Sequence, residues 1–301
     1  MPKFKTPEME KINARLNRKK PKKYSFWADA WKRLRRNRLA MVGLGMIALL
    51  LLLAIFAGVI TPFKYTDVNP SEKFQSPNAR HIFGTDQLGR DIFSRCIYAA
   101  RISLPMGIVC SIAAVSLGGL FGLVAAFFMG KTDNTIMRVM DVLQSIPGTL
   151  MAICVVASLG TGIVQLVIAI AISGIPIFAR TVRSAVLTVR DNEYVEASRV
   201  VGAGNVLLMA RHILPNCVGH VIIFVVSSIA GNILVISGMS YIGLGIQPPT
   251  PEWGSLLSAG KTFIQSYPYM VIFPGLFILI TVFAFNLFGD GVRDALDPRL
   301  K

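Results

Sequence analysis

Five long blocks of this chain contain no charged side chain, and they constrain its fold more than any other feature. The blocks are Met41–Ile60, Ile102–Met129, Val142–Ala179, Val221–Pro251 and Thr262–Gly289. A helix needs about 20 apolar residues to cross the roughly 30 Å of hydrocarbon in a bilayer. Only 16% of all residues are charged, against about 25% in a soluble domain. We therefore expect an all-α, polytopic membrane protein.

One block is long enough to cross the membrane twice. Val142–Ala179 is broken near its middle by Gly160-Thr161-Gly162. The sequence thus predicts six transmembrane helices, at about 40–60, 103–129, 139–159, 163–180, 217–241 and 269–289. The first block follows a long basic segment and lacks a small-x-small cleavage site, so we expect a retained span and not a signal peptide.

The positive charge is concentrated at the N-terminus. Residues 1–38 hold fourteen of the 31 Lys and Arg residues, and the chain carries a net charge of +15. Basic residues that flank spans mark the cytoplasmic side, so we expect the N-terminus inside and, with six spans, the C-terminus inside as well. The arm is expected to contact anionic membrane lipid, and no nucleic-acid partner is expected.

These patterns divide the chain into a few parts. Residues 1–38 form a basic cytoplasmic arm, 39–60 the first transmembrane helix, 61–101 an outer loop, and 102–301 a core with five transmembrane helices and a cytoplasmic loop at about 181–215. Apolar side chains within Tyr24–Arg38 recur at helical spacing, which predicts an amphipathic helix on the membrane surface; a solvated linker is the alternative. The four cysteines, Cys96, Cys110, Cys154 and Cys217, have no paired spacing and are interpreted as small buried hydrophobes.

The cytoplasmic loop between the fourth and fifth predicted spans has the pattern of helix, glycine corner and helix. Asp191 or Asn192 is positioned to cap a helix that runs to Val201. The segment 202–204, Gly-Ala-Gly, provides the tight backbone that ends this helix. A second short helix is expected to end at about Ile213, before Pro215. The loop should form a compact knob in water.

The knob also carries a family resemblance. Glu196-Ala197-Ser198, then Gly202 and Leu214-Pro215 at fixed spacing, resemble the "EAA" loop of ABC importer permeases, through which a cytoplasmic ATPase drives the membrane subunit. The resemblance implies an ATPase-coupling set of Glu193, Glu196, Ala197, Ser198, Gly202, His212, Leu214 and Pro215. Ser198 replaces the usual second Ala, and His212 stands where many members have Ile. An ordinary charged loop is the alternative.

Two further motifs resemble the dipeptide, oligopeptide and nickel permeases of that family. The run 81–95 is similar to their "GTDxxGRD" segment, with Gly84, Thr85, Asp86, Gly89, Arg90 and Asp91. We expect Thr85 or Asp86 to cap a helix there. The run 239–257 is similar to their outer gate loop, with Gly243, Gly245, Pro248, Pro249, Trp253 and Gly254. Glu252 and Trp253 are expected near the outer surface, as a charge and an interfacial aromatic. The run 286–299 also follows the subfamily pattern.

The resemblance implies a non-catalytic subunit that forms half of a translocation path in a bacterial or archaeal plasma membrane. Its partners would be a homologous permease, forming a heterodimer, two ABC ATPases and an extracytoplasmic binding protein. Short peptides are the first expectation for the substrate, and nickel is the second. Gly-Lys-Thr tripeptides begin at Gly130 and Gly260, but Ala125 and Ser255 stand where a Walker A motif requires glycine. We expect this chain to bind no cofactor or metal, and ATP to be used by partner subunits.

An ion-coupled carrier or a channel is the alternative from another class. Carriers place ionisable groups within their spans at a cost of about 2.5–3.5 kcal/mol each. The apolar blocks of this chain contain none, and Asp141, near Arg138, is expected to be structural. A channel would leave the cytoplasmic knob without a role.

Overall fold

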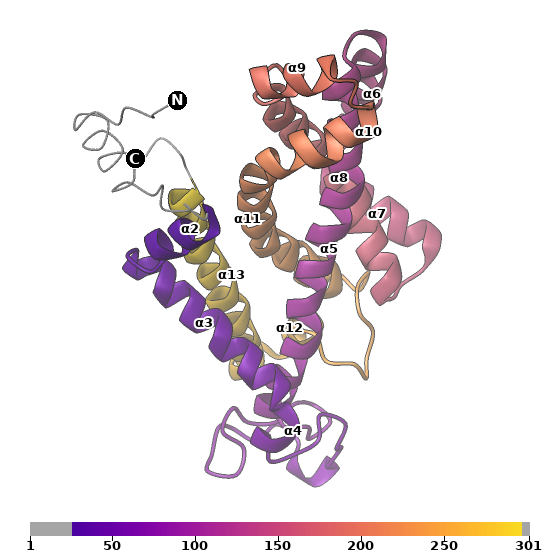
Figure 1. Cartoon of the computed structure of the whole chain (residues 1–301). Coiled ribbons are helices and arrows are strands. Elements are labelled where there is room, and N and C mark those ends of the chain that lie inside the picture. The colour runs from indigo at the N-terminus through magenta and orange to yellow at the C-terminus, as the bar shows by residue number, and fades with distance from the viewer. Residues whose placement is uncertain (1–25, 297–301) are drawn as a thin grey trace, which may run out of the picture.

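The computed structural model describes residues 26–296, and within that range its regular elements are helices (Figure 1). The longer ones are α2 (Phe26–Leu34), α3 (Arg38–Ile55), α5 (Ile92–Phe128), α6 (Gly130–Gln144), α7 (Gly148–Leu159), α8 (Ile163–Leu187), α9 (Glu193–Val200), α11 (Leu214–Tyr241), α12 (Trp253–Gly260) and α13 (Tyr269–Leu296). The short ones are α4 (Ala57–Ile60), α10 (Asn205–Leu207), a π-helical turn η2 (Leu208–Ile213) and the 3-10 turns η1 (Pro70–Glu72) and η3 (Lys261–Phe263).

Helix α5 is the spine of the molecule. Its 37 residues correspond to about 55 Å of helix, and it packs against α8, α11 and α3. Helix α13 packs along α3 and α11. Figure 1 shows α2 and α9 at one end of the bundle and α4 at the opposite end.

Five helices are long and apolar enough to span a membrane: α3, α5, α8, α11 and α13. They lie where five of the six spans are predicted. The expected single span 139–159 is wrong as a straight helix, because α6 and α7 meet at an angle of 82°. The cause is Pro147, which lies at the junction, lacks an amide hydrogen and disfavours helical backbone in the preceding residue. The structure has a sixth span only if α6 and α7 cross the membrane together as one bent segment.

Helix α5 begins eleven residues earlier than the span predicted from hydropathy. The Asp91 side chain accepts a hydrogen bond from the Ser94 amide at 2.7 Å and caps the helix. The expectation that Thr85 or Asp86 would be the cap is therefore wrong. The first turns of α5 lie within the segment that was assigned to an outer loop.

Helix α11 does not begin at a proline stop. The short helix α10 passes through the π-helical turn η2 directly into α11, so that 205–241 forms one continuous helical segment of 37 residues. Pro215 lies in the first turn of α11, where its missing amide hydrogen is tolerated. The expected break before Pro215 is wrong for this reason.

Glycines bring α5 and α8 into close contact. A Cβ atom added to Gly118 would lie 2.5 Å from the Ile175 carbonyl oxygen, and one added to Gly122 would lie 2.2 Å from that of Ala179. The GxxxG spacing of these residues thus marks a real helix–helix contact.

Ion pairs hold α6 on α8. Asp133 pairs with Arg183 through two contacts of 2.6 Å, and Asp141 pairs with Arg180.

The remaining expectations concern α2 and the cysteines. Helix α2 forms within the segment predicted to be amphipathic, with Trp27 and Trp31 exposed and Leu34 buried; the rest of the basic arm lies outside the described residues.

Cys96, Cys110 and Cys217 are buried as expected, but Cys154 is exposed on α7. It lies on a helix that packs mainly on α8, which leaves its other face uncovered.

Candidate coupling site and gate

The predicted knob consists of α9, the glycine corner, α10 and η2. Asn192 occupies the cap position of α9 but makes no side-chain capping hydrogen bond, and α9 ends at Val200. Gly202 follows with φ +92°, and space is open around it. A residue with a Cβ atom would be strained in this left-handed conformation, by about 1–2 kcal/mol. The corner therefore depends on glycine for its backbone and not for lack of room.

Buried side chains fix the knob to the bundle. Val195, Leu208 and Ile213 are fully buried and pack in one cluster with residues of α5 and α8. Arg190 adds a hydrogen bond from its Nη1 to the Ala126 carbonyl at the end of α5, at 2.9 Å. The knob is thus a rigid extension of α5 and α8, although it has the sequence of a charged loop.

The residues predicted to form the coupling set are gathered on this knob and its junction with α11. Glu193, Glu196, Ala197, Gly202, Leu214 and Pro215 are exposed, and Ser198 and His212 are half-buried. Ser198 donates its hydroxyl hydrogen to the Tyr194 carbonyl at 2.8 Å. Neither Glu193 nor Glu196 forms an ion pair among the described residues. Both carboxylates are therefore available to a partner.

The structure adds apolar residues that the sequence reasoning missed. Val200, Val201 and Val206 flank the glycine corner and are 87%, 88% and 75% exposed. Valines at the ends of short helices resemble core residues in sequence, and the only available signal was their proximity to Gly202. Exposed apolar side chains gathered at one tip mark an interaction surface. We call Val200, Val201 and Val206 the apolar tip.

The apolar tip gives a prediction about assembly. We expect the double substitution Val200→Ser/Val201→Ser to weaken retention of a protein partner about tenfold, because burying an apolar side chain contributes roughly 1.5–3 kcal/mol. Partner retention during purification over a detergent wash series measures this. Val200→Ile/Val201→Ile is the control and should retain the partner. Equal retention in both variants would remove the apolar tip from the interface.

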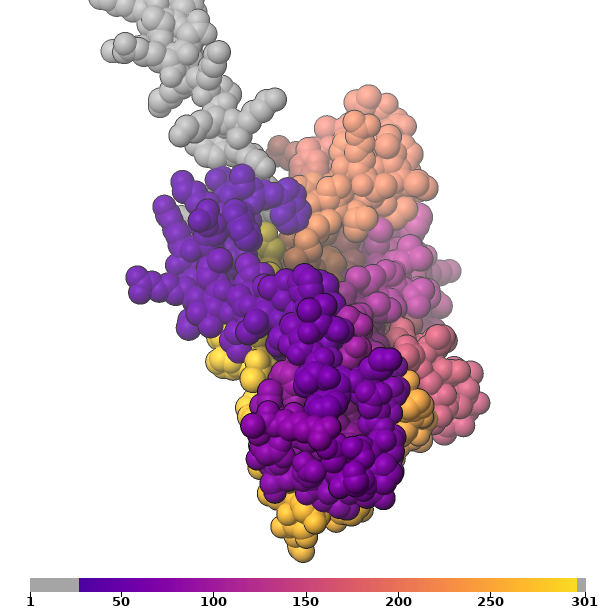
Figure 2. All heavy atoms as spheres, turned by 90° about the horizontal axis from the view of Figure 1, so that it is seen from below, coloured from indigo at the N-terminus to yellow at the C-terminus, as the bar shows by residue number. Residues whose placement is uncertain are grey.

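Residues 61–91 form a compact cap next to α4, visible as the purple body in Figure 2, and the motif 84–91 lies mostly buried within it. Asp86 is buried and its Oδ2 accepts from Arg90 Nε at 2.7 Å and Arg95 Nη1 at 2.5 Å. His81 Nδ1 lies 2.9 Å from Asp91 Oδ1. The other motif residues are also buried here: Gly84 and Gly89, both with positive φ, and Thr85, whose Oγ1 accepts from the Gln75 amide. The geometry indicates that this motif holds the cap together.

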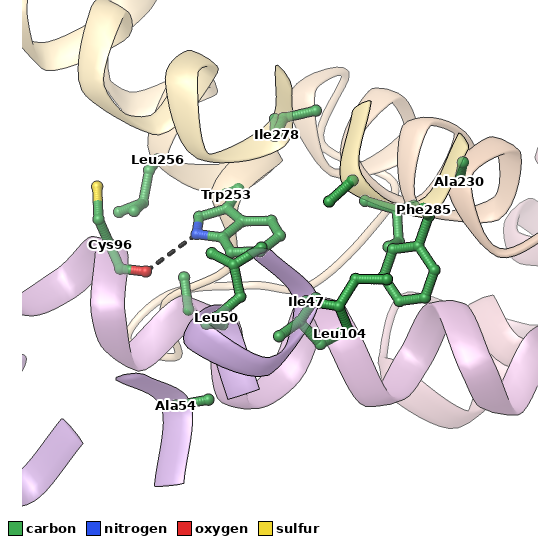
Figure 3. Close-up of a cluster of buried hydrophobic side chains, with 14 of the residues drawn as sticks. Ile47, Leu50, Ala54, Cys96, Leu104, Ala230, Trp253, Leu256, Ile278 and Phe285 are labelled. Atoms are coloured by element: carbon green, nitrogen blue, oxygen red, sulfur yellow. Dashed lines mark hydrogen bonds between the residues drawn. The ribbon is translucent and has the colours of Figure 1, made fainter. Parts of the chain in front are cut away.

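The loop 242–252 and α12 contain the residues predicted for the gate. Gly243 has φ +87°, Gly245 and Gly254 are buried, and Pro248 and Pro249 are exposed. Glu252 and Trp253, which were expected near the outer surface of the membrane, do not present their side chains there, because both are fully buried within the protein. The Trp253 indole donates to the Cys96 carbonyl at 2.9 Å, among Leu50 and Leu256 (Figure 3). A buried acceptor is what allows the indole N–H to leave water.

Glu252 joins three helices through neutral donors. Its Oε1 accepts from the hydroxyl groups of Ser103 on α5 and Ser237 on α11, at 3.3 and 3.2 Å. Its Oε2 accepts from the Ser255 amide at 3.0 Å and caps α12. Among the residues that the structure covers, no Lys or Arg pairs with it. This carboxylate therefore fixes α12 against the ends of α5 and α11.

Comparisons with known proteins match this architecture. The family model described as "Binding-protein-dependent transport system inner membrane component" matches residues 118–301, and "N-terminal TM domain of oligopeptide transport permease C" matches residues 25–77. The dipeptide transport system permease protein DppC of Alkalihalophilus pseudofirmus is 43% identical over 277 residues, covering 92% of this chain and 91% of that protein. The glutathione transport system permease protein GsiD of Escherichia coli is 43% identical over 281 residues, covering 91% of each chain.

A solved structure supports the fold. The inward-facing MetNI methionine ABC transporter aligns with a TM-score of 0.57 at 16% identity, covering 68% of this chain and 97% of that chain. The family model and the two relatives define the class of protein as an ABC transporter permease, a multi-pass protein of the inner membrane. The chain belongs to the family of binding-protein-dependent transport system inner membrane components. The resemblance inferred from the sequence motifs is confirmed.

Proposed function

We propose that this chain is one permease subunit of an ATP-driven importer and forms half of its translocation path. Its partners are a homologous permease, with which it forms a heterodimer, two cytoplasmic ABC ATPases and an extracytoplasmic binding protein. The ATPases bind and hydrolyse ATP, and this chain binds no cofactor. The rigid knob with its exposed apolar tip and unpaired Glu193 and Glu196 is the observation that carries the proposal.

The proposed topology has six spans with both ends in the cytoplasm. It counts the bent pair α6 and α7 as one span, beside the five long apolar helices. The knob and the basic helix α2 lie at the same end of the bundle (Figure 1), as a common cytoplasmic location requires. The cap and the loop 242–252 then belong to the outer side.

The proposed mechanism is alternating access driven from the knob. Closure of the ATPases on ATP displaces the knobs of the two permeases, and the paired bundles open outward to accept substrate from the binding protein. Because buried contacts fix the knob to α5 and α8, its displacement moves those helices with it. Glu196 and Gly202 act in this coupling and do not line the path.

The proposed substrate class is short peptides. The relatives named for dipeptide and glutathione transport, both 43% identical to this chain, favour peptidic solutes. A nickel complex is the second candidate within the same family. Titration of the cognate binding protein with dipeptides, glutathione and nickel salts separates these possibilities.

The assembly is tested by purifying the tagged chain from its native membrane in a gentle detergent and identifying the proteins that accompany it. We expect a second permease and ATPases with Walker motifs. Recovery of the chain alone, still active in uptake after reconstitution, would favour the carrier or channel alternative.

A substitution at the glycine corner tests the coupling role. We expect Gly202→Asp to abolish substrate-stimulated ATP hydrolysis and uptake while assembly is retained. A Cβ atom is strained at φ +92°, so the substitution forces the backbone of the corner into another conformation and changes the direction of the knob. Transport and ATPase rates measured in proteoliposomes check this. Unchanged rates at normal assembly would refute the coupling role of the knob.

A further inference from the structure

A groove of about 320 Å³ lies between α3 and α5, at the end of α3 next to α4. Its walls are aliphatic: Leu51, Ala54 and Ile55 on α3, and Ala100, Leu104 and Pro105 on α5. Ala54 and Ala100 contribute only methyl groups to this lining and leave the space between the larger side chains unfilled. A single charged group, the Arg101 side chain, completes the lining.

The Arg101 guanidinium is held in place at this groove. Its Nε donates to the Ala54 carbonyl at 2.5 Å and its Nη2 donates to the Ile55 carbonyl at 2.8 Å. The guanidinium carbon lies 5.1 Å from the centre of the Tyr98 ring. These contacts use neutral groups, and no carboxylate among residues 26–296 pairs with Arg101. The charge is therefore fixed in position but not neutralised.

The depth of the groove in the bilayer follows from the length of α3. Its 18 residues extend about 27 Å, close to the roughly 30 Å thickness of the hydrocarbon. The last residues of α3, whose carbonyl groups Arg101 contacts, thus lie at the level of the lipid headgroups. Leu51 lies one helical turn deeper, among the acyl chains.

We propose that this groove binds a phospholipid, with the phosphate on Arg101 and one acyl chain along the exposed side chains of Leu51 and Pro105. An anionic phosphate supplies the charge that the guanidinium lacks, through the charge-assisted hydrogen bonds that Arg forms with phosphate. The apolar walls match an acyl chain. In the topology proposed above, this lipid belongs to the outer leaflet. The inference requires only that α3 spans the membrane, and it is independent of ATP coupling.

A photoreactive lipid tests the site directly. The transporter is purified with its partners and reconstituted in nanodiscs of phosphatidylglycerol and phosphatidylcholine that contain phosphatidylglycerol with a diazirine in its acyl chain. After illumination, we expect labelled peptides from the end of α3 and from residues around Pro105. Arg101→Gln should reduce this labelling about tenfold, which corresponds to about 1.4 kcal/mol.

Matched variants separate lipid binding from damage to the fold. Lys261→Gln is the control, because Lys261 also holds its charge over a ring, 5.2 Å from the centre of Tyr241, but lies outside the groove. It should not change labelling in the groove. Leu51→Trp fills the groove while the Arg101 contacts with Ala54 and Ile55 remain, and it should also reduce labelling.

Leu51→Trp decides the outcome if Arg101→Gln lowers the melting temperature. Equal labelling of the wild type and Leu51→Trp would overturn the proposal. A photo-crosslinker introduced at Leu51 that captures the partner permease and no lipid would also overturn it, because the groove would then be filled by protein.

Discussion

Asp86→Asn is expected to destabilise the cap by about 3–5 kcal/mol, the usual cost of leaving a buried charge without its partner. The Asp86 carboxylate accepts from both Arg90 and Arg95, and all three side chains are buried. Asparagine preserves the shape but leaves two guanidinium groups without a counter-charge. Thermal unfolding in detergent and the amount of protein in the membrane measure the effect.

An aspartate in the same segment provides the control. Asp67 is exposed and accepts from the Lys64 amide at 3.1 Å, so Asp67→Asn should change stability by no more than about 0.5 kcal/mol. Adding Arg95→Gln to Asp86→Asn should recover part of the loss, because one uncompensated charge is removed. Equal melting temperatures for Asp86→Asn and Asp67→Asn would show that the cap does not depend on this ion cluster.

The contact between α5 and α8 gives the second large effect. Gly122→Ala would place a methyl group 2.2 Å from the Ala179 carbonyl oxygen and 2.9 Å from the Arg183 amide nitrogen. Both are backbone atoms and cannot move without separating the helices. We expect a loss of at least 1–3 kcal/mol, typical of overpacking, together with loss of uptake in proteoliposomes.

A neighbouring glycine on the same helix is the matched control. A Cβ atom at Gly119 would lie 3.5 Å from Val182 Cγ2, an ordinary van der Waals contact. Gly119→Ala should therefore be tolerated, or stabilise α5 by up to about 1 kcal/mol through helix propensity. If Gly122→Ala and Gly119→Ala melt at the same temperature, close packing at Gly122 does not limit stability.

Most spans were predictable because charge limits each apolar block on both sides. The bend between α6 and α7 was not, because Val142–Ala179 is free of charge and gives a continuous hydropathy signal across Pro147. The direction of α6 is fixed by ion pairs with α8 that join residues 50 and 39 positions apart. Such tertiary contacts leave no trace in a local pattern.

In the candidate sites, too, some features could be predicted from the sequence and others could not. The resemblance identified the knob and its coupling residues, whereas Val200 and Val201 were missed because exposure depends on which face of α9 Val195 anchors. Trp253 and Glu252 beside a proline-rich loop have the composition of a membrane interface. Their burial depends on acceptors and donors from α5 and α11, which the sequence does not reveal.

The uninterrupted helical segment 205–241 has a consequence for timing. It begins within the knob and ends where the loop 242–252 starts, a path of about 55 Å without a hinge other than the π-helical turn η2. The helical backbone continues through the bend between η2 and α11 that Figure 1 shows, so no loop separates the knob from the far end of α11. A movement of the knob should therefore reach the loop 242–252 through α11 itself, and the two ends of the transporter should change state together.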